Sequence, residues 1–436
     1  MKYISTGNTS TVSIREATLK CFAPDGGLYL PERLPIIPRA LFNNIAEMSL
    51  TEIAYVVTNT LLGDEVESWK LKSVVETTFN FPIPLKTLHD HTSVLELFHG
   101  PTLAFKDISA RFMALAMNIE KISAAQPMTI LTATTGNTGG AIANAFAGMK
   151  NARVLVLYPR GAMSRSQLAQ FTTIGRNVYP FEVNGSISQC KRMVREACED
   201  SELAETTMPV CVNTQNIIRL LPQIVYFFYA YAQLKKAGCD ADGFTVALPC
   251  GNLSNLTSAI IAKRMGLPIK HIVGGCNAND DFVRVIRGEL NPDKVNVNSR
   301  QTIANAMDSG YPTNLHRVLF LYKNNLDALR ADIDVYSLND EEIAQTVINC
   351  LDSYGYLCDP HTAVALGALQ KSGTNNTSVV LATAHPAKSL DTMTEITGRA
   401  VELPLQLTRF MSKQTASAKL PPTYAALKKY ILNLNQ

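Results

Sequence analysis

The sequence predicts an α/β fold built around mostly parallel sheets, and three observations support this prediction. From about residue 91 onwards, short apolar runs typical of buried strands alternate with longer segments typical of amphipathic helices. Several of these runs lead directly into a turn rich in Gly, Thr, Asn or Ser, which a helical pattern then follows. The sequence has no repeat, low-complexity tract or block of like charge. This pattern favours strand–helix–strand units in globular domains.

The alternation divides the 436 residues into three expected parts. Residues 1–90 are expected to form an N-terminal segment that ends in the proline-bearing stretch FPIPLKTL. Residues 91–205 are expected to form a smaller αβ domain, and residues 206–436 a larger one with C-terminal helices. A chain of this length exceeds a single hydrophobic core. We therefore expect two parallel-sheet αβα domains in addition to the N-terminal segment.

Apolar runs of strand length identify the expected strands. They are Val94–Leu97, Thr129–Ala133, Arg153–Tyr158, Val178–Val183, Val210–Val212, Thr245–Leu248, His271–Gly274 and Ser378–Ala382. Longer segments with helical periodicity identify the expected helices. The clearest are Ser186–Cys198, Ile217–Leu234, Asp340–Leu351, His361–Gln370 and Tyr424–Leu432.

Composition and charge argue against several classes of protein. Hydrophobic residues make up 46% of the chain and the formal net charge is +3, so we expect neither nucleic-acid nor membrane partners. The N-terminus lacks an apolar signal core. The nine cysteines include no CxxC pair, which favours reduced thiols in a cytoplasmic enzyme. His89 and His91 are interpreted as part of a polar loop, and we expect no metal site.

The segment Leu95–Asp107, LELFHGPTLAFKD, carries the first candidate catalytic residue, Lys106. Apolar positions predict an amphipathic helix of about 15 residues from Phe105. A lysine beside Phe105 and Leu103 is partly desolvated, which lowers the pKa of its amine and makes it a nucleophile able to form a Schiff base with an aldehyde. The alternative is an ordinary lysine in the first turn of a helix, with its ammonium in water.

Two further segments have the form of anion-binding turns. Thr132–Ala141, TATTGNTGGA, follows an apolar run, and so does Val246–Asn255, VALPCGNLSN. A strand, a small-residue turn and a helix together present free backbone N–H groups to a carboxylate or phosphate. A plain turn between a strand and a helix is the alternative for each. Neither turn has the spacing of a dinucleotide fold or a P-loop.

A fourth segment, Val379–Lys388, places Thr383 at the carboxyl end of an expected strand. Open α/β sheets bind ligands at that end. Pro386 suits the first turn of a following helix.

Taken together, these segments resemble the threonine synthases. FHGPTLAFKD, TATTGNTGGA, PCGNLSN and ATAHPAK occur in the order and approximate spacing of that family. DGGLYLPERLP at Asp25–Pro35, NTQNIIRLL at Asn213–Leu221 and IANAMDSGYPTNLHRV at Ile303–Val318 extend the resemblance to nearly the whole chain. The resemblance implies a pyridoxal phosphate (PLP) enzyme of fold type II, with the tryptophan-synthase-β-like fold. Many members have Gly where this chain has Ser254.

The resemblance also implies roles for individual residues. Lys106 is the expected Schiff-base lysine, Asn137 faces the 3′-oxygen of PLP, and Thr383 faces the pyridine nitrogen. The cofactor phosphate is expected on the loop formed by Gly251, Asn252, Leu253, Ser254 and Asn255.

The implied reaction converts O-phospho-L-homoserine and water to L-threonine and phosphate. Thr134, Thr135 and Thr138 are expected to hold the substrate carboxylate. Because arginine pairs well with phosphate oxygens, Arg219 and Arg160 are the first candidates for the substrate phosphate, and Lys388 is the third. Asn213 and Asn216 are expected to add donors to the same group.

Three alternatives to this reaction stay open. One is another reaction of the same fold type, such as serine/threonine dehydration or cysteine synthesis, which the IANAMDSGYPTN stretch disfavours. A second is a pseudoenzyme that binds PLP without catalysis, and a third is a nucleotide-binding regulatory protein. The sequence does not decide between a monomer and a homodimer.

Overall fold

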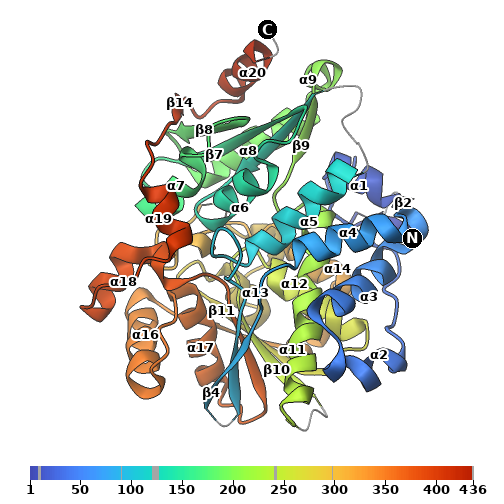
Figure 1. The fold of residues 1–436 in the computed structure, drawn as a ribbon, viewed down its shortest axis with the longest axis vertical. Helices are drawn as coiled ribbons and strands as arrows, with labels where there is room; N and C mark the ends of the chain where they lie inside the picture. The colour runs from blue at the N-terminus through green and yellow to red at the C-terminus, as the bar shows by residue number, and fades with distance from the viewer. Residues whose placement is uncertain (8–10, 90, 120–126, 240–242, 297, 435–436) are drawn as a thin grey trace.

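The fold contains two parallel β-sheets with helices on their faces and an N-terminal segment along one side (Figure 1). It is described from a computed structural model, which covers residues 1–7, 11–89, 91–119, 127–239, 243–296 and 298–434. The predicted α/β class with parallel sheets is therefore confirmed.

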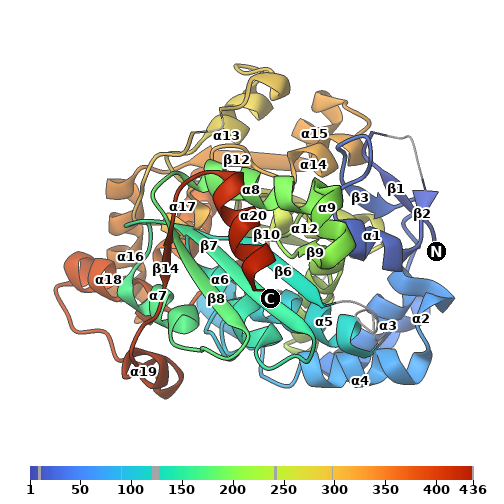
Figure 2. The same cartoon turned by 90° about the horizontal axis from the view of Figure 1, so that it is seen from above.

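The smaller sheet has five parallel strands in the order β14-β8-β7-β6-β9. The strands are β6 (Met128–Ala133), β7 (Ala152–Pro159), β8 (Val178–Val183), β9 (Met208–Cys211) and β14 (Ala418–Leu420). The helices around this sheet are α5 (Lys106–Ile119), α6 (Asn137–Phe146), α7 (Arg165–Thr172), α8 (Ile187–Glu199), α9 (Ser201–Thr206) and α20 (Tyr424–Asn433). Seen from above, α20 lies beside α8 over the sheet (Figure 2).

Successive side chains of these strands pack on opposite faces, as the pleat of a strand requires. Ile130 packs with residues of α5 and α6, whereas its neighbour Leu131 packs with residues of α8 and α20. Both faces are therefore buried, which explains why the strands form continuous apolar runs in the sequence.

The larger sheet has six strands in the order β12-β11-β10-β13-β5-β4, and only β4 runs antiparallel to its neighbour. The strands are β4 (Leu85–His89), β5 (Thr92–Glu96), β10 (Phe244–Pro249), β11 (Ile269–Cys276), β12 (Ile333–Ser337) and β13 (Ser378–Ala382). Val246 packs with α11 and α12 on one face, and Ala247 packs with α17 on the other. The helices of this part are α11 (Val225–Lys236), α12 (Ser254–Arg264), α13 (Asp281–Arg287), α14 (Leu315–Leu321), α15 (Leu326–Asp332), α16 (Asp340–Tyr354), α17 (Pro360–Ser372), α18 (Leu390–Thr397) and α19 (Leu405–Met411).

The N-terminal segment contains a small antiparallel sheet in the order β2-β1-β3. Its strands are β1 (Tyr3–Ser5), β2 (Thr11–Val12) and β3 (Tyr29–Pro31), and its helices are α1 (Ile14–Lys20), α2 (Arg39–Asn44), α3 (Leu50–Leu62) and α4 (Ser68–Thr78). A capping box between Ser49 and Glu52 begins α3. Its buried side chains pack into the core cluster that α11 shares.

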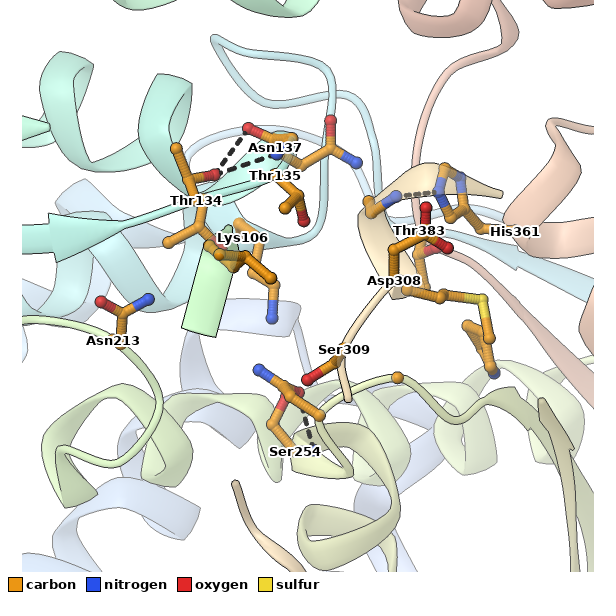
Figure 3. A pocket seen from close by; sticks show the side chains of 18 of the residues that line it. Lys106, Thr134, Thr135, Asn137, Asn213, Ser254, Asp308, Ser309, His361 and Thr383 are labelled. Carbon is orange, nitrogen blue, oxygen red and sulfur yellow. Dashed lines mark hydrogen bonds between the residues drawn. The ribbon is translucent and has the colours of Figure 1, made fainter. Parts of the chain in front are cut away.

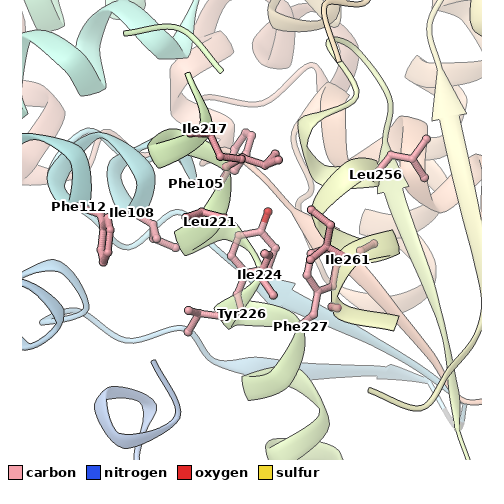
Figure 4. Close-up of a cluster of buried hydrophobic side chains, with 14 of the residues drawn as sticks. Phe105, Ile108, Phe112, Ile217, Leu221, Ile224, Tyr226, Phe227, Leu256 and Ile261 are labelled. Atoms are coloured by element: carbon pink, nitrogen blue, oxygen red, sulfur yellow. The ribbon is translucent and has the colours of Figure 1, made fainter. Parts of the chain in front are cut away.

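The expected helix Ile217–Leu234 is divided in the structure. Pro222 lacks the N–H that a continuous α-helix requires, so a 3-10 turn over Leu221–Gln223 separates α10 (Ile217–Leu220) from α11. Side chains from these turns pack with Phe105 and Ile108 of the Lys106 segment and with α12 (Figure 4). This cluster joins the two parallel sheets beneath the candidate site.

Strand pairing crosses the expected domain limits. β5, within 91–205, pairs with β13 in the larger sheet. β9, within 206–436, pairs with β6, and β14 near the C-terminus pairs with β8 in the smaller sheet. Each of these strands lies next to one from a distant part of the sequence, and such pairing leaves no local signal. The prediction that these limits separate functional domains stays untested.

Candidate active site

The candidate site is a cavity at the carboxyl ends of strands from both parallel sheets. The space within its wall, which includes a part open to solvent, is about 790 Å³. Turns after β6, β9 and β10 and the residue after β13 form much of its wall (Figure 3). The predicted site residues on this wall are Lys106, Thr134, Thr135, Asn137, Thr138, Asn213, Gly251, Asn252, Ser254, Asn255 and Thr383.

Lys106 is the first residue of α5, and its amine points into the cavity (Figure 3). The side chain is buried, and its Nζ lies 4.2 Å from the centroid of the Phe105 ring. Burial, together with the nearby guanidinium of Arg219, lowers the pKa of Lys106 to about 7. A substantial fraction of this amine is therefore neutral and nucleophilic near neutral pH.

The backbone around Lys106 is fixed to the strand end that carries Thr383. The N–H of Phe105 donates to the carbonyl of Thr383 at 2.9 Å, and the N–H of His385 donates to the carbonyl of Leu103 at 3.1 Å. Asp107 accepts bonds from the N–H and hydroxyl of Thr102 at 2.8 and 2.5 Å. These bonds fix the position of the backbone at Lys106 relative to the backbone at Thr383.

The turn after β6 leads into the amino end of α6. The hydroxyl oxygen of Thr134 accepts bonds from the N–H groups of Gly136 and Gly139 at 3.0 and 3.1 Å, so this side chain holds the turn in shape. Thr135 and Thr138 also line the cavity. The Oδ1 atom of Asn137 is buried and has no hydrogen-bond partner among the described residues. A buried polar atom in this condition is suited to a ligand.

The turn after β10 leads into α12. Leu253, just before this helix, has a left-handed backbone conformation, with φ +64°. Ser254 is the first residue of the helix, so the family glycine at this position is not required by the backbone. The side chain of Leu253 is buried in the hydrophobic core and does not line the cavity. Its predicted role is therefore limited to the backbone of the loop.

Gly251 lies against the segment that contains Met307. A Cβ atom at Gly251 would lie 3.0 Å from the Cα of Met307. The side chains of this turn bond to protein atoms: Asn252 donates to the hydroxyl of Thr214 at 2.7 Å, and Asn255 accepts from the hydroxyl of Tyr226. The N–H of Ser254 donates to Oδ1 of Asn252 at 3.1 Å. The other first-turn N–H groups of α12 have no acceptor within their own helix, so they are what this turn offers an anion.

Several wall residues had not been predicted as site residues, although some lie in segments used for the family resemblance. They are Phe105, Ala133, Gly136, Ile187, Lys191, Pro249, Ala306, Met307, Asp308, Ser309 and His361. They carry no local motif for a site, and those from Ala306 onwards reach the cavity by tertiary packing alone.

His361 is buried at the start of α17 and has a defined tautomer. Its Nε2 accepts a bond from the N–H of Ala306 at 3.0 Å, so the ring proton lies on Nδ1, which donates to Asp359 at 2.5 Å. Asp359 is also the N-cap of α17. The pair therefore holds the Ala306–Asp308 segment against the cavity.

Asp308 lies on the same wall and accepts several bonds. Its oxygens accept from the N–H and hydroxyl of Thr302 at 3.0 and 2.8 Å, and from the amide of Asn277 at 2.9 Å. Burial raises the pKa of Asp308 to about 6 despite these bonds.

Lys191 belongs to α8 and reaches the cavity from the smaller sheet. Its Nζ donates to the hydroxyl of Ser309 at 3.0 Å. Burial lowers the pKa of Lys191 to about 8.

Arg219 is fully buried but is absent from the cavity wall. Its Nε donates to the hydroxyl of Ser109 at 3.1 Å, and its Nη1 donates to the carbonyl of Val212 at 2.5 Å. The guanidinium lies close enough to lower the pKa of Lys106. Its Nη2 is buried and has no hydrogen-bond partner among the described residues. Because Arg219 does not line the cavity in this structure, its predicted contact with the substrate phosphate stays untested.

Three other predicted substrate contacts are also absent from the wall. Arg160 is 70% exposed and lies 3.8 Å from Glu182. Lys388 is buried, and its ammonium donates to the carbonyl of Thr102 and to Gln170. Asn216 caps α10 and donates to backbone carbonyls. The structure therefore does not bring these three residues to the cavity, and their predicted contacts with the substrate stay untested.

The geometry defines the class of protein. A buried lysine of lowered pKa between two helix-start turns, with an unpaired amide on Asn137, fits an aldehyde cofactor that carries a phosphate. No group of His, Cys, Asp and Glu residues among the described positions has the arrangement of a metal site. Residues 83–384 match the family described as pyridoxal-phosphate dependent enzyme. The chain is thus a PLP-dependent enzyme of fold type II.

The particular family follows from the two ends of the chain. Residues 2–79 match the threonine synthase N terminus and residues 362–431 match the threonine synthase C-terminal region. The chain is 37% identical to threonine synthase of Haemophilus influenzae and 35% identical to that of Escherichia coli, with 97% of each chain covered. The chain belongs to the threonine synthase family, as the resemblance predicted.

Solved structures agree with this assignment. The crystal structure of threonine synthase from Escherichia coli superimposes with a TM-score of 0.93 at 34% identity, with 100% of both chains covered. A PLP-bound threonine synthase from Brucella melitensis gives a TM-score of 0.90 at 29% identity, also over 100% of both chains. No helix among the described residues has the length and apolarity needed to span a membrane.

Proposed function

We propose that this protein converts O-phospho-L-homoserine and water to L-threonine and phosphate. The observation that carries the proposal is the position of Lys106, buried on the wall of a cavity between two anion-binding turns. The family assignment supports the same reaction, because the relatives named above are threonine synthases.

The residues that would hold PLP follow from the shape of the wall. Lys106 would bind the cofactor covalently, the backbone of Gly251–Asn255 would hold its phosphate, Asn137 would face its 3′-oxygen, and Thr383 its pyridine nitrogen. When bound, PLP supplies an electron sink for the reacting carbons of the amino acid. Thr383 is a neutral partner, so it does not favour a proton on that nitrogen.

Lys106 is also the proposed base. Because its pKa is lowered to about 7, its Nζ can accept the proton from the substrate Cα at neutral pH and return it later in the reaction. Thr135 and Thr138 would donate to the substrate carboxylate together with the backbone of the Thr134–Thr138 turn. Asn213 lines the same side of the cavity, and its amide already bonds to the backbone of Ala133 at 2.9 and 3.0 Å. We therefore assign it a positioning role for that turn.

The alternatives receive less support. A dehydratase or cysteine synthase of the same fold type is not favoured, because both terminal regions match threonine synthase. A pseudoenzyme is disfavoured by the intact Lys106 and both turns. We further propose a cytoplasmic location, which the free cysteines support. The choice between monomer and homodimer stays a prediction for a sizing experiment.

The decisive experiment measures phosphate and threonine released from O-phospho-L-homoserine by the PLP-loaded protein. We expect both products in equal amounts, with no product from Lys106→Ala. Pyruvate formed from serine at a higher catalytic efficiency than threonine from phosphohomoserine would instead establish a dehydratase. Bound PLP without any turnover would establish the pseudoenzyme.

A further inference from the structure

The substrate has two anionic groups and the cofactor has one, so the reaction proposed above requires three anion sites. The turn before α12 and the turn before α6 account for the cofactor phosphate and the substrate carboxylate. None of Arg219, Arg160 and Lys388 lies on the cavity wall, so the substrate phosphate lacks a cation among the residues first considered.

Lys191 has the properties that this third site needs. Ile187 and Lys191 are separated by one helical turn, and both line the cavity, so one face of α8 borders it. The ammonium donates to Ser309, whose hydroxyl is neutral, and the described residues provide no carboxylate within ion-pair distance. Lys191 is partly exposed at the cavity, and its partly desolvated ammonium has an unfavourable energy without a counter-charge. An anionic ligand would offset that energy.

The surroundings of Lys191 favour a ligand that bridges the two sheets. Lys191 comes from a helix of the smaller sheet, whereas Ser309 lies 118 positions further along the chain, beside the turn that precedes α12. The carboxylate of Asp308 is nearby in sequence, but its oxygens are occupied by Thr302 and Asn277. The ammonium of Lys191 and the hydroxyl of Ser309 therefore form a polar pair at the boundary between the sheets.

The hydroxyl of Ser309 accepts from Lys191 and donates to the carbonyl of Tyr311 at 3.1 Å, so it holds the ammonium in place. We propose that Lys191, positioned by Ser309, binds the phosphate of the substrate and so determines specificity for a phosphorylated amino acid. This inference rests on the proposed function, because it assigns the leaving group of that reaction to a residue. Lys191 acts on the group that departs and not on the cofactor. Its loss should therefore separate substrate recognition from PLP binding.

The chain offers a matched control one residue away. Arg192 is also a cation of α8, but its side chain is 62% exposed and lies 3.7 Å from Glu196. Lys191→Ala and Arg192→Ala remove the same unit charge from the same helix, and only the first faces the cavity. Lys191→Gln provides a second variant that keeps a long polar side chain if the alanine variant folds poorly.

The experiment uses PLP-loaded protein and three measurements on each variant. The kcat/KM for O-phospho-L-homoserine should fall about ten- to hundredfold in Lys191→Ala and Lys191→Gln, the scale of a lost charge-assisted phosphate contact. The affinity for inorganic phosphate, measured by calorimetry, should fall with it. The slow reaction with serine, which has no phosphate, should change by less than about threefold, and Arg192→Ala should match the unmodified protein in all three measurements.

Two results would overturn the assignment. Equal losses with serine and with phosphohomoserine would make Lys191 a contact of the carboxylate or of the fold. Unchanged phosphate affinity in both Lys191 variants would remove it from the phosphate site. Failure of the unmodified protein to release phosphate would refute the proposed function, and the calorimetric comparison with inorganic phosphate would still decide the role of Lys191.

Discussion

The two anion-binding turns look alike in sequence but differ in how their side chains are used. In the turn before α12, Asn252 and Asn255 bond to Thr214 and Tyr226, and the side chain of Ser254 lines the cavity. In the turn before α6, Thr135 and Thr138 line the cavity, and the Oδ1 of Asn137 has no partner among the described residues.

We relate this difference between the turns to their proposed ligands, which are the permanent cofactor phosphate and the transient substrate carboxylate. A turn whose side chains are engaged presents a rigid set of backbone N–H groups, which suits a resident cofactor phosphate. A turn with free hydroxyl groups, here those of Thr135 and Thr138, can form bonds that change as the substrate binds, reacts and leaves, whereas Asn137 of the same turn is proposed to face the cofactor. The comparison predicts that changes in the first turn affect cofactor affinity and that changes in the second affect the KM of the substrate.

The largest expected effect comes from adding a methyl group to each turn. In Gly251→Ala the new Cβ would lie 3.0 Å from the Cα of Met307, a backbone atom that cannot move freely. Overpacking of this kind costs about 1–3 kcal/mol, so PLP affinity should fall about five- to 150-fold. Titration of the apo-protein with PLP, followed by absorbance, measures this change.

Gly136→Ala is the matched variant in the other turn. Its Cβ would meet the Cβ of Ala306 and the amide of Gln167 at 3.1 Å. This change should raise the KM for phosphohomoserine and leave PLP affinity within about twofold of the unmodified protein. Loss of cofactor affinity in Gly136→Ala, comparable to that in Gly251→Ala, would remove the distinction between the turns.

An intermediate effect is expected from pH, because both turns act around the amine of Lys106. The folded pKa of this amine is lowered to about 7 from the usual 10.5. The neutral amine is the nucleophile, so the rate at which apo-protein attaches PLP should rise about tenfold per pH unit below 7 and level off above it. Stopped-flow absorbance follows the attachment. A rate that continues to rise to pH 10 would show that the amine titrates as an exposed lysine.

The smallest effect is expected for Thr135→Ala. The variant removes one of several proposed donors to the substrate carboxylate, and a loss of about 0.5–1.5 kcal/mol corresponds to a two- to tenfold increase in KM. PLP content should remain unchanged, and steady-state kinetics at saturating cofactor measure the increase. A variant with normal KM but depleted PLP would assign Thr135 to the cofactor instead.

Much of the fold was predictable from sequence where strands are buried on both faces. Val178–Val183 and Ser378–Ala382 were predicted with the limits that the structure has. β4 and β12 were not predicted, because they lie at the edges of their sheet, where β4 has no buried side chain and β12 has only two. β14 is only three residues long, and it is a strand because it pairs in parallel with β8.

The site was predictable where a local motif marks it and not where packing creates it. Lys106 and the two turns lie in distinctive segments that reach the cavity wall. His361, Asp308 and Lys191 come from separate elements and meet there only after folding. The candidate arginines show the limit of charge type as a signal, because it did not predict that Arg219 would bond to the backbone away from the cavity wall.

The backbone bonds between Leu103–Phe105 and Thr383–His385 join two segments that both follow strands of the six-stranded sheet. Lys106, Thr383 and the turn before α12, which are proposed to hold the cofactor, all follow strands of the six-stranded sheet. The carboxylate turn and Lys191 follow strands of the five-stranded sheet. Most of the groups proposed for the cofactor therefore come from one half of the molecule and most of those proposed for the substrate from the other, with Asn137 and Ser309 as exceptions. Exchange of the segment from β6 to β9 with that of another fold type II enzyme becomes a rational route to a new substrate on the same catalytic frame.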